Sequence, residues 1–240
     1  MSSLPQIVQT VSYLALPLML AIVLHEYAHG LVADHFGDDT ARRHGRLTMN
    51  PLPHIDLFGT IIFPLLCLIT GGFLLAWAKP VPVNASQLRD PRRHMALVAA
   101  AGPAANLFLA VASALLYGAL LSIDQSIPMG LARDGLDARP DMLGMILVPL
   151  SVMALYSVLI NVLLMVFNLI PIPPLDGGRI LTSLLPVRPA MALRRLEPYG
   201  MLIIIGLIIL DPHIGVIHMI TGTLVHRRPV GSDRRVARSH

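Results

Sequence analysis

The fold of this chain is determined by one stretch, Val11-Ser12-Tyr13-Leu14-Ala15-Leu16-Pro17-Leu18-Met19-Leu20-Ala21-Ile22-Val23-Leu24-His25-Glu26-Tyr27-Ala28-His29. Up to Leu24 it is almost wholly apolar, and from His25 to His29 it forms a His-Glu-x-x-His motif. On a helix, residues four apart lie one turn apart on the same face, so both imidazoles can reach one Zn²⁺ ion. The motif normally lines an aqueous cleft. Here it ends an apolar run, and the stretch therefore predicts a metal site within a membrane protein.

The composition of the whole chain supports this interpretation. Its 240 residues are 55% hydrophobic and only 13% charged, whereas about 25% charged residues is typical of soluble domains. The net charge of +4 comes from basic residues grouped in short segments beside apolar runs. Such a pattern is typical of the cytoplasmic face of a membrane protein, so nucleic-acid binding is not expected. The predicted fold class is an all-α polytopic membrane protein.

The apolar runs predict about four to six transmembrane helices. A helical span needs about 20 apolar residues, and residues 7–33, 94–123, 143–169 and 199–225 meet this requirement. A fifth run, 57–78, contains glycines and a proline and has basic residues on both flanks. A full crossing would place one basic cluster outside, so we predict a re-entrant segment, with an ordinary kinked span as the alternative. The nearby residues 47–49 and 81–83 resemble short strands, and a small β-containing segment is expected there.

Charge also predicts the orientation and the domain boundaries. Segment 124–142 is rich in aspartate and fits the outside, whereas 171–198 carries four arginines and fits the cytoplasm. The histidines of the motif are then expected near the cytoplasmic side. Residues 1–226 are predicted to form one integral membrane domain, followed by a basic tail, 227–240, that is expected to be disordered. A single last span would put this tail outside, while a hairpin broken at Asp211-Pro212 would return it to the cytoplasm; both remain open.

A zinc site needs a third protein ligand besides the two histidines, with water in the fourth position. Near the motif, no polar residue stands out as this third ligand; the candidates are Asp34, His35, Asp38, Asp39, His44, His54 and Asp56. A better candidate is Asp176, within Asn168-Leu169-Ile170-Pro171-Ile172-Pro173-Pro174-Leu175-Asp176-Gly177-Gly178-Arg179. Prolines restrict the backbone and glycines allow close approach, so this segment can present one carboxylate with little freedom. In isolation, a Pro-Gly turn with an Asx-type aspartate would be favoured.

The two motifs together resemble the site-2 protease family of intramembrane zinc metalloproteases. Further similar stretches are 45–51, 53–56, 78–84 and 101–106, so the resemblance covers roughly residues 20–180. It implies that His25, His29 and Asp176 bind one Zn²⁺ per chain. It also implies that Glu26 is the general base and acid, and that Asn168 lies near the reacting carbonyl. The chain resembles the compact bacterial type, and no PDZ or CBS domain is expected within its 240 residues.

Two further polar residues belong to these similar stretches. His54 is expected either to face the site or to make a supporting or structural hydrogen bond. Asn106 follows a glycine and small residues in an apolar run, and we expect it to aid close helix packing and to bond a neighbouring helix.

The resemblance implies a zinc-dependent endopeptidase that cuts within or near transmembrane segments. The expected partners are membrane proteins, such as anti-sigma-factor-like proteins or signal-peptide remnants, and the lipid of a bacterial inner membrane. One alternative is a metal transporter or metal-handling protein, since intramembrane His and Asp also mark ion pathways. Another is a catalytically silent scaffold. Glu26 argues against both, because the chain has only two glutamates and metal binding alone would not require one inside the motif.

Overall fold

The structure is a computed structural model that describes residues 4–62, 65–66, 79–123, 142–200, 202 and 206. The chain divides into two compact units, Met1–Glu197 and Pro198–His240. Nearly all described residues belong to the first unit. The predicted boundary between residues 226 and 227 and the basic tail lie outside the described residues.

The described part of the chain is helical. Its α-helices are α1 (Leu4–His35), α2 (Thr40–Arg43), α4 (Pro91–Ile123), α6 (Met142–Asn168), α7 (Asp176–Leu184) and α8 (Val187–Arg194). Short 3₁₀-helices, η1 (Leu52–His54) and η3 (Ala85–Gln87), and a π-helix, η2 (Leu57–Ile62), complete the list. No strand occurs within these described ranges. The predicted all-α class is confirmed.

Three of these helices are long and apolar enough to cross a membrane: Val11–His35, Pro91–Ile123 and Gly144–Asn168. They correspond to the predicted spans 7–33, 94–123 and 143–169. The predicted span 199–225 lies almost wholly outside the described residues, as does most of the proposed re-entrant run 57–78. What is described of that run begins with η2.

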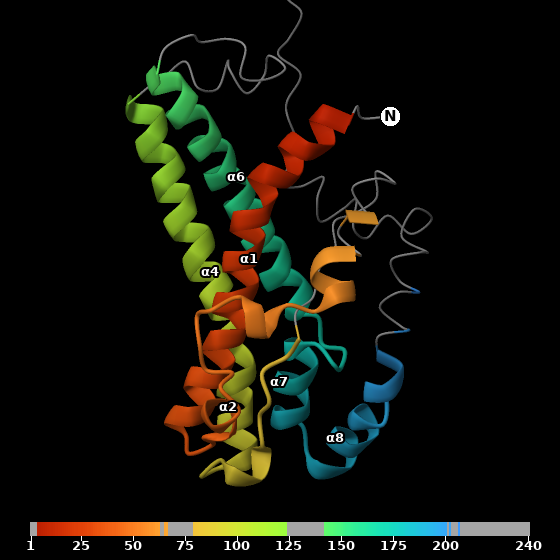
Figure 1. Cartoon of the computed structure of the whole chain (residues 1–240). Coiled ribbons are helices and arrows are strands. Elements are labelled where there is room, and N and C mark those ends of the chain that lie inside the picture. Colours follow the sequence, from red (N-terminus) through yellow and green to blue (C-terminus); the bar gives the residue numbers. More distant parts are fainter. Residues whose placement is uncertain are drawn as a thin grey trace, which may run out of the picture. The chain divides into compact units, whose positions relative to one another are not determined.

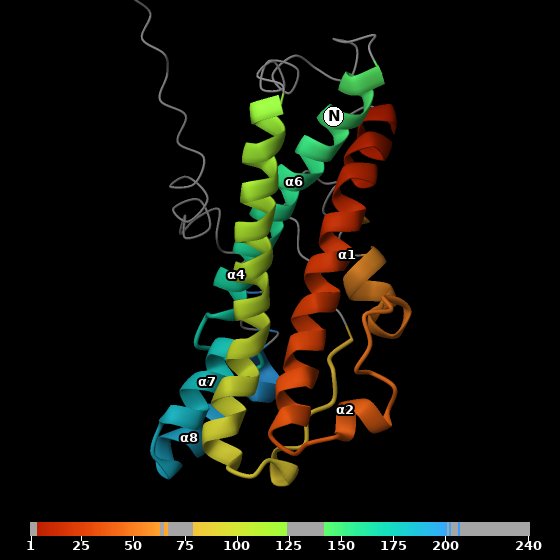
Figure 2. The same ribbon diagram turned by 90° about the vertical axis from the view of Figure 1, so that its left-hand side faces the viewer.

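The three long helices pack against one another (Figures 1 and 2). The chain runs in opposite directions along α1 and α4 and returns along α6, so the ends of α1 and α6 lie at the same end of the bundle as the start of α4. Away from these contacts, large apolar side chains such as Phe108 and Leu115 are about 70% exposed (72% and 71%). Such side chains on long apolar helices fit contact with lipid better than contact with water. The protein is therefore an integral membrane protein in its architecture.

The loop after α1 is held by a buried carboxylate. Asp38 is fully buried; it accepts hydrogen bonds from the Thr40 amide (3.1 Å) and hydroxyl, and from the Asn84 amide at 2.6 Å. Arg46 donates to the carbonyls of Pro53 and Lys79 (2.8 Å to the latter). Within the described residues, these bonds connect residues 38–53 with residues 79–84.

The expected β-containing segment is not confirmed. Residues 47–49 are bends and residues 81–83 carry no regular structure. The physical reason lies in the hydrogen bonds of this stretch. The amides of Val81 and Asn84 donate to the carboxylates of Glu26 and Asp38, so they are used by side chains of α1 and its loop instead of a neighbouring strand.

The turn between α6 and α7 depends on the two glycines after Asp176. A Cβ at Gly177 would lie 2.2 Å from the Leu169 carbonyl oxygen, and one at Gly178 would lie 2.3 Å from the Pro173 nitrogen. These are backbone atoms that cannot simply rotate away, so the start of α7 can approach the preceding turn only without side chains. Helix α7 also packs against α4. Arg92, near the start of α4, donates to the carbonyl of Leu185, just after the end of α7.

Removing the Asp38 carboxylate should strongly destabilise the protein. In Asp38→Ala the Thr40 and Asn84 groups lose their acceptor in a buried place, which costs about 2–3 kcal/mol or more. The matched control is Asp39→Ala. This neighbour has a half-exposed side chain and an ion pair with Arg43 at 2.8 Å, and its loss should cost about 0–1 kcal/mol. Thermal unfolding in detergent checks both, and equal melting temperatures for the two variants would contradict the assignment.

Candidate metal centre

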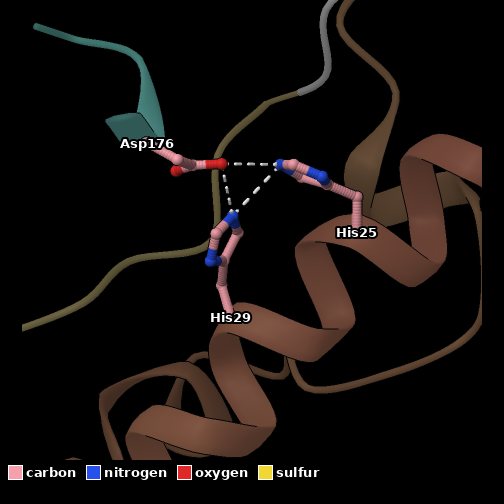
Figure 3. Close-up of side chains that lie close together, drawn as sticks. All are labelled: His25, His29 and Asp176. Carbon is pink, nitrogen blue, oxygen red and sulfur yellow. Dashed lines mark hydrogen bonds and ion pairs between the residues drawn. The ribbon is translucent and has the colours of Figure 1, made fainter. Parts of the chain in front are cut away.

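Three side chains from distant parts of the sequence converge at one point inside the bundle (Figure 3). His25 and His29 project from one face of α1, and Asp176 comes from the first residue of α7. The distances from Asp176 Oδ2 to His25 Nε2 and His29 Nε2 are 3.2 and 3.3 Å. The two Nε2 atoms are 3.1 Å apart. All three residues are buried.

This triangle has the dimensions of a tetrahedral metal site. Zinc binds imidazole nitrogen and carboxylate oxygen at about 2.0–2.2 Å, and tetrahedral angles then separate neighbouring ligand atoms by about 3.3 Å. Apart from the two imidazoles, Asp176 Oδ2 has no hydrogen-bond partner among the described residues. Burial acts to raise the pKa of the Asp176 carboxyl, but the neighbouring imidazoles outweigh it and hold the pKa well below its usual range. The carboxylate is therefore ionised, as a ligand must be.

The outer nitrogens of the two imidazoles are both occupied. His29 Nδ1 lies 2.7 Å from the Val98 carbonyl oxygen, which can only accept, so Nδ1 carries the proton. His25 Nδ1 lies 2.6 Å from Asn106 Oδ1. With the proton on Nδ1, each Nε2 presents a lone pair. Two lone pairs and a carboxylate oxygen would then face each other at van der Waals contact or closer, so positive charge must lie among them: either a proton on an Nε2, which is what lowers the pKa of Asp176, or a metal cation in its place.

Gly102 of α4 provides the space for such a cation. A Cβ at this position would lie 2.4 Å from His29 Nε2 and 2.7 Å from His25 Nε2. The backbone of α4 therefore approaches the metal-binding edge of both imidazoles directly. Any other residue would place an apolar atom where the ligand atoms converge.

Glu26 is held beside this cluster by the backbone. Its Oε2 atom accepts a hydrogen bond of 2.8 Å from the Val81 amide. The side chain is only half-buried, and Glu26 directly follows the ligand His25 in α1. The carboxylate is thus fixed next to the cluster without belonging to it, which suits a group that transfers protons.

The hydrogen bonds of the other predicted residues go to partners outside the His-His-Asp cluster. Asn168 is the last residue of α6, and its carboxamide nitrogen donates to the Leu164 carbonyl at 3.0 Å. His54 is buried, and its Nε2 pairs with the Thr48 carbonyl at 2.9 Å, so it serves the loop structure. The polar residues near the motif also have other partners: Asp34 binds Arg42, Asp39 binds Arg43, His44 binds the Thr40 carbonyl, Asp56 caps η2, and His35 packs on Phe36.

The sequence alone assigned no role at the site to Gly102, and it assigned to Asn106 only close helix packing and a bond to a neighbouring helix. It did not single out Asn161, which bonds Asn106 across the α4–α6 interface. The expected interhelical bond of Asn106 is confirmed, but the same side chain also bonds a histidine of the cluster. A signal was present in each case. Gly102 and Asn106 are four residues apart on one helix face, and Asn161 is a carboxamide within a strongly apolar span, where polar residues are rarely without function.

The fold and the cluster define an integral membrane protein with a buried His-His-Asp metal site and an adjacent carboxylate. Residues 13–210 match the model of peptidase family M50, and the chain belongs to this family. The resemblance to the site-2 proteases is thereby confirmed. The protein is accordingly a zinc metalloprotease.

Several relatives carry the same activity in their names. “Putative zinc metalloprotease YwhC” of Bacillus subtilis is 36% identical over 199 residues, which cover 82% of this chain and 80% of the relative. “Putative zinc metalloprotease Rip2” of Mycolicibacterium smegmatis is 30% identical over 194 residues, which cover 80% of this chain and 64% of the relative. Rip2 of Mycobacterium tuberculosis is 28% identical over 163 residues, 66% of this chain and 52% of the relative. No solved structure matches the chain.

Adding one methyl group at Gly102 should abolish tight zinc binding. In Gly102→Ala the new Cβ would displace both imidazoles, and zinc affinity should fall at least about tenfold. The matched control is Gly118→Ala on the same helix, where a Cβ meets nothing within 4 Å. Zinc content after purification and competition with a chelator measure the effect. Wild-type affinity in Gly102→Ala would show that the described approach of α4 is wrong.

Proposed function

We propose that this protein is an intramembrane endopeptidase that hydrolyses peptide bonds within or near the transmembrane segments of other proteins. The observation that carries the proposal is the position of the buried His-His-Asp cluster. It lies between α1 and α4, two of the three helices that are long and apolar enough to span a membrane, and the start of α7. A hydrolytic site at this depth is reached most directly by a substrate that is itself in the membrane.

In this proposal His25, His29 and Asp176 are the zinc ligands. Zinc held there supplies Lewis-acid chemistry and makes a water molecule acidic near neutral pH. Glu26, held by the Val81 amide, accepts the proton of the attacking water and later donates it to the leaving nitrogen. The Nδ1–H groups of His29 and His25 donate to the Val98 carbonyl and to Asn106 Oδ1, so neither Nδ1 is available as the proton carrier.

Asn168 is proposed to hydrogen-bond the substrate backbone. It ends α6 at the turn that leads to Asp176, and the carbonyl of the next residue, Leu169, lies against Gly177. A substrate helix must unwind before its carbonyls can react, because all of them are bonded within the helix. A side-chain amide near the cluster can replace one of the bonds that unwinding breaks, and thereby favour the reactive conformation.

The site is proposed to face the cytoplasmic side of a bacterial inner membrane. Helices α2, α7 and α8 and the start of α4 lie at the same end of the bundle (Figures 1 and 2). These elements carry most of the described arginines: Arg42, Arg43, Arg92, Arg93, Arg179, Arg188 and Arg194. An excess of arginine marks the cytoplasmic end of membrane helices. The proposed substrates are single-span proteins such as anti-sigma-factor-like proteins or signal-peptide remnants.

Replacing Glu26 by glutamine should stop cleavage but keep zinc. The glutamine carbonyl can still accept the Val81 amide, so geometry is retained while proton transfer is lost, and the rate should fall at least about a hundredfold. Purified wild type, Glu26→Gln and Asp176→Ala are compared on a panel of single-span substrates in proteoliposomes. Glu197→Gln, which changes the only other glutamate, is the control and should cleave normally. Equal cleavage by all variants would refute the proposal.

Removing zinc tests the same site against a transport function. Treatment with a strong chelator should abolish cleavage, and added zinc should restore it in wild type but not in Asp176→Ala. The same vesicles are assayed for zinc uptake. Zinc flux that is unchanged in Glu26→Gln, together with no cleavage by wild type, would instead support a metal transporter.

A further inference from the structure

We propose that Asn106 is a positioning residue of the metal site, and that Asn161 of α6 holds it in the one orientation that makes His25 a ligand. This inference rests on the proposed metal site and concerns how the chain prepares it. Asn106 and Asn161 are both fully buried, and they connect His25 to a backbone carbonyl two helices away.

The chain of hydrogen bonds begins at Ser157. The Ser157 carbonyl lies 2.8 Å from Asn161 Nδ2, within α6. A carbonyl oxygen can only accept, so the carboxamide of Asn161 must place its NH₂ group here. Its oxygen, Oδ1, then faces α4. The orientation of the first amide is thus fixed by the backbone, although the two ends of an amide are nearly alike in shape.

Asn106 is oriented in turn by Asn161. The nitrogen Nδ2 of Asn106 lies 2.8 Å from Asn161 Oδ1 and 3.3 Å from the Ala21 carbonyl of α1. Both partners are acceptors, so the NH₂ group of Asn106 must face them. A flipped amide would bring oxygen against oxygen at two places in a buried region. Asn106 Oδ1 therefore faces His25.

The consequence is a defined tautomer for His25. Its Nδ1 lies 2.6 Å from an oxygen that can only accept, so Nδ1 carries the proton and Nε2 carries the lone pair. His29 reaches the same tautomer through the Val98 carbonyl, which belongs to the backbone. His25 instead depends on two side chains, and each can be replaced by mutation.

A role in helix packing alone does not account for this pair. Two carboxamides without exposed surface, between apolar helices, are costly unless every bond is made, and apolar residues of similar size would fill the space without that cost. Ser157 and Ser113 extend the network, with hydroxyl oxygens 2.7 Å apart, and the Ser157 hydroxyl also accepts a longer bond of 3.3 Å from Asn161 Nδ2. Ser157→Ala removes these hydroxyl bonds but keeps the Ser157 carbonyl, which accepts the shorter bond of 2.8 Å from the same NH₂ group, so the orientation of Asn161 is retained and the variant serves as a control.

The test measures metal binding by Asn106→Leu, Asn161→Leu and the control Ser157→Ala in detergent. The readouts are zinc affinity by chelator competition and the visible absorption spectrum of the Co²⁺-loaded protein, which reports ligand geometry. Asn106→Leu should lose about 10–100-fold in zinc affinity and show an altered Co²⁺ spectrum. Asn161→Leu should show a smaller loss in the same direction, because the Ala21 carbonyl still holds Asn106. Ser157→Ala should bind as wild type does.

A conservative variant separates positioning from folding. In Asn106→Asp one carboxyl oxygen can still accept the His25 Nδ1 proton, and the other, when protonated, can donate to Asn161 Oδ1, so zinc affinity should be higher than in Asn106→Leu. Melting temperatures of the metal-free variants show which of them are folded. Equal zinc affinity in Asn106→Leu and Ser157→Ala, with one common Co²⁺ spectrum, would overturn the proposal. If Asn106→Leu does not fold, Asn161→Leu decides in the same way. Failure of wild type to bind either metal would refute the proposed metal site itself.

Discussion

A buried imidazole can serve as a metal ligand only if its second nitrogen also has a partner, and the rest of this structure depends on that requirement. In a bundle bounded by lipid, water is not at hand to supply the partner. Helix α4 supplies it for both histidines. The Val98 carbonyl and the Asn106 carboxamide lie eight residues apart on one face, with Gly102 midway between them. One face of one helix therefore provides an acceptor for each histidine and, between the acceptors, the space in which a metal fits.

The third ligand, Asp176, is brought to this face of α4 by the turn between α6 and α7. Asp176 is separated from the histidines by about 150 residues of sequence, and it arrives at the end of a stiff, proline-rich turn. The turn approaches the start of α7 so closely that Gly177 and Gly178 cannot carry side chains. Because α7 packs on α4, the same helix that orients the histidines also supports the element that carries the carboxylate. The proline-rich turn between α6 and α7 thus restricts the backbone after the end of a membrane helix and holds the Asp176 carboxylate in a fixed position.

Sequence alone predicted much of this arrangement, because its strongest signals are local. The helical spacing of His25 and His29, the length of the apolar runs and the Pro-Gly context of Asp176 are each visible within a few residues. The strand-like residues 81–83 show the opposite case. Their composition fits a strand, but the amides of Val81 and Asn84 bond to Glu26 and Asp38, carboxylates that are far away in the sequence. The hydrogen bond between Asn106 and Asn161 could not be predicted from the sequence either, because only the packing of α4 against α6 determines which of their residues meet.

The ligands and the base are therefore positioned by different parts of the molecule. His25, His29 and Asp176 are fixed by contacts among α1, α4, α6 and α7, all of which are buried helix contacts. Glu26 is fixed by residue Val81 of the loop, and that loop is held by Asp38 and Arg46 outside the bundle. A metal site needs fixed distances, whereas a base must exchange protons with water and with a substrate. Placing the ligands between helices and the base against a loop meets both needs, because the three ligands are buried whereas the Glu26 side chain is only half-buried.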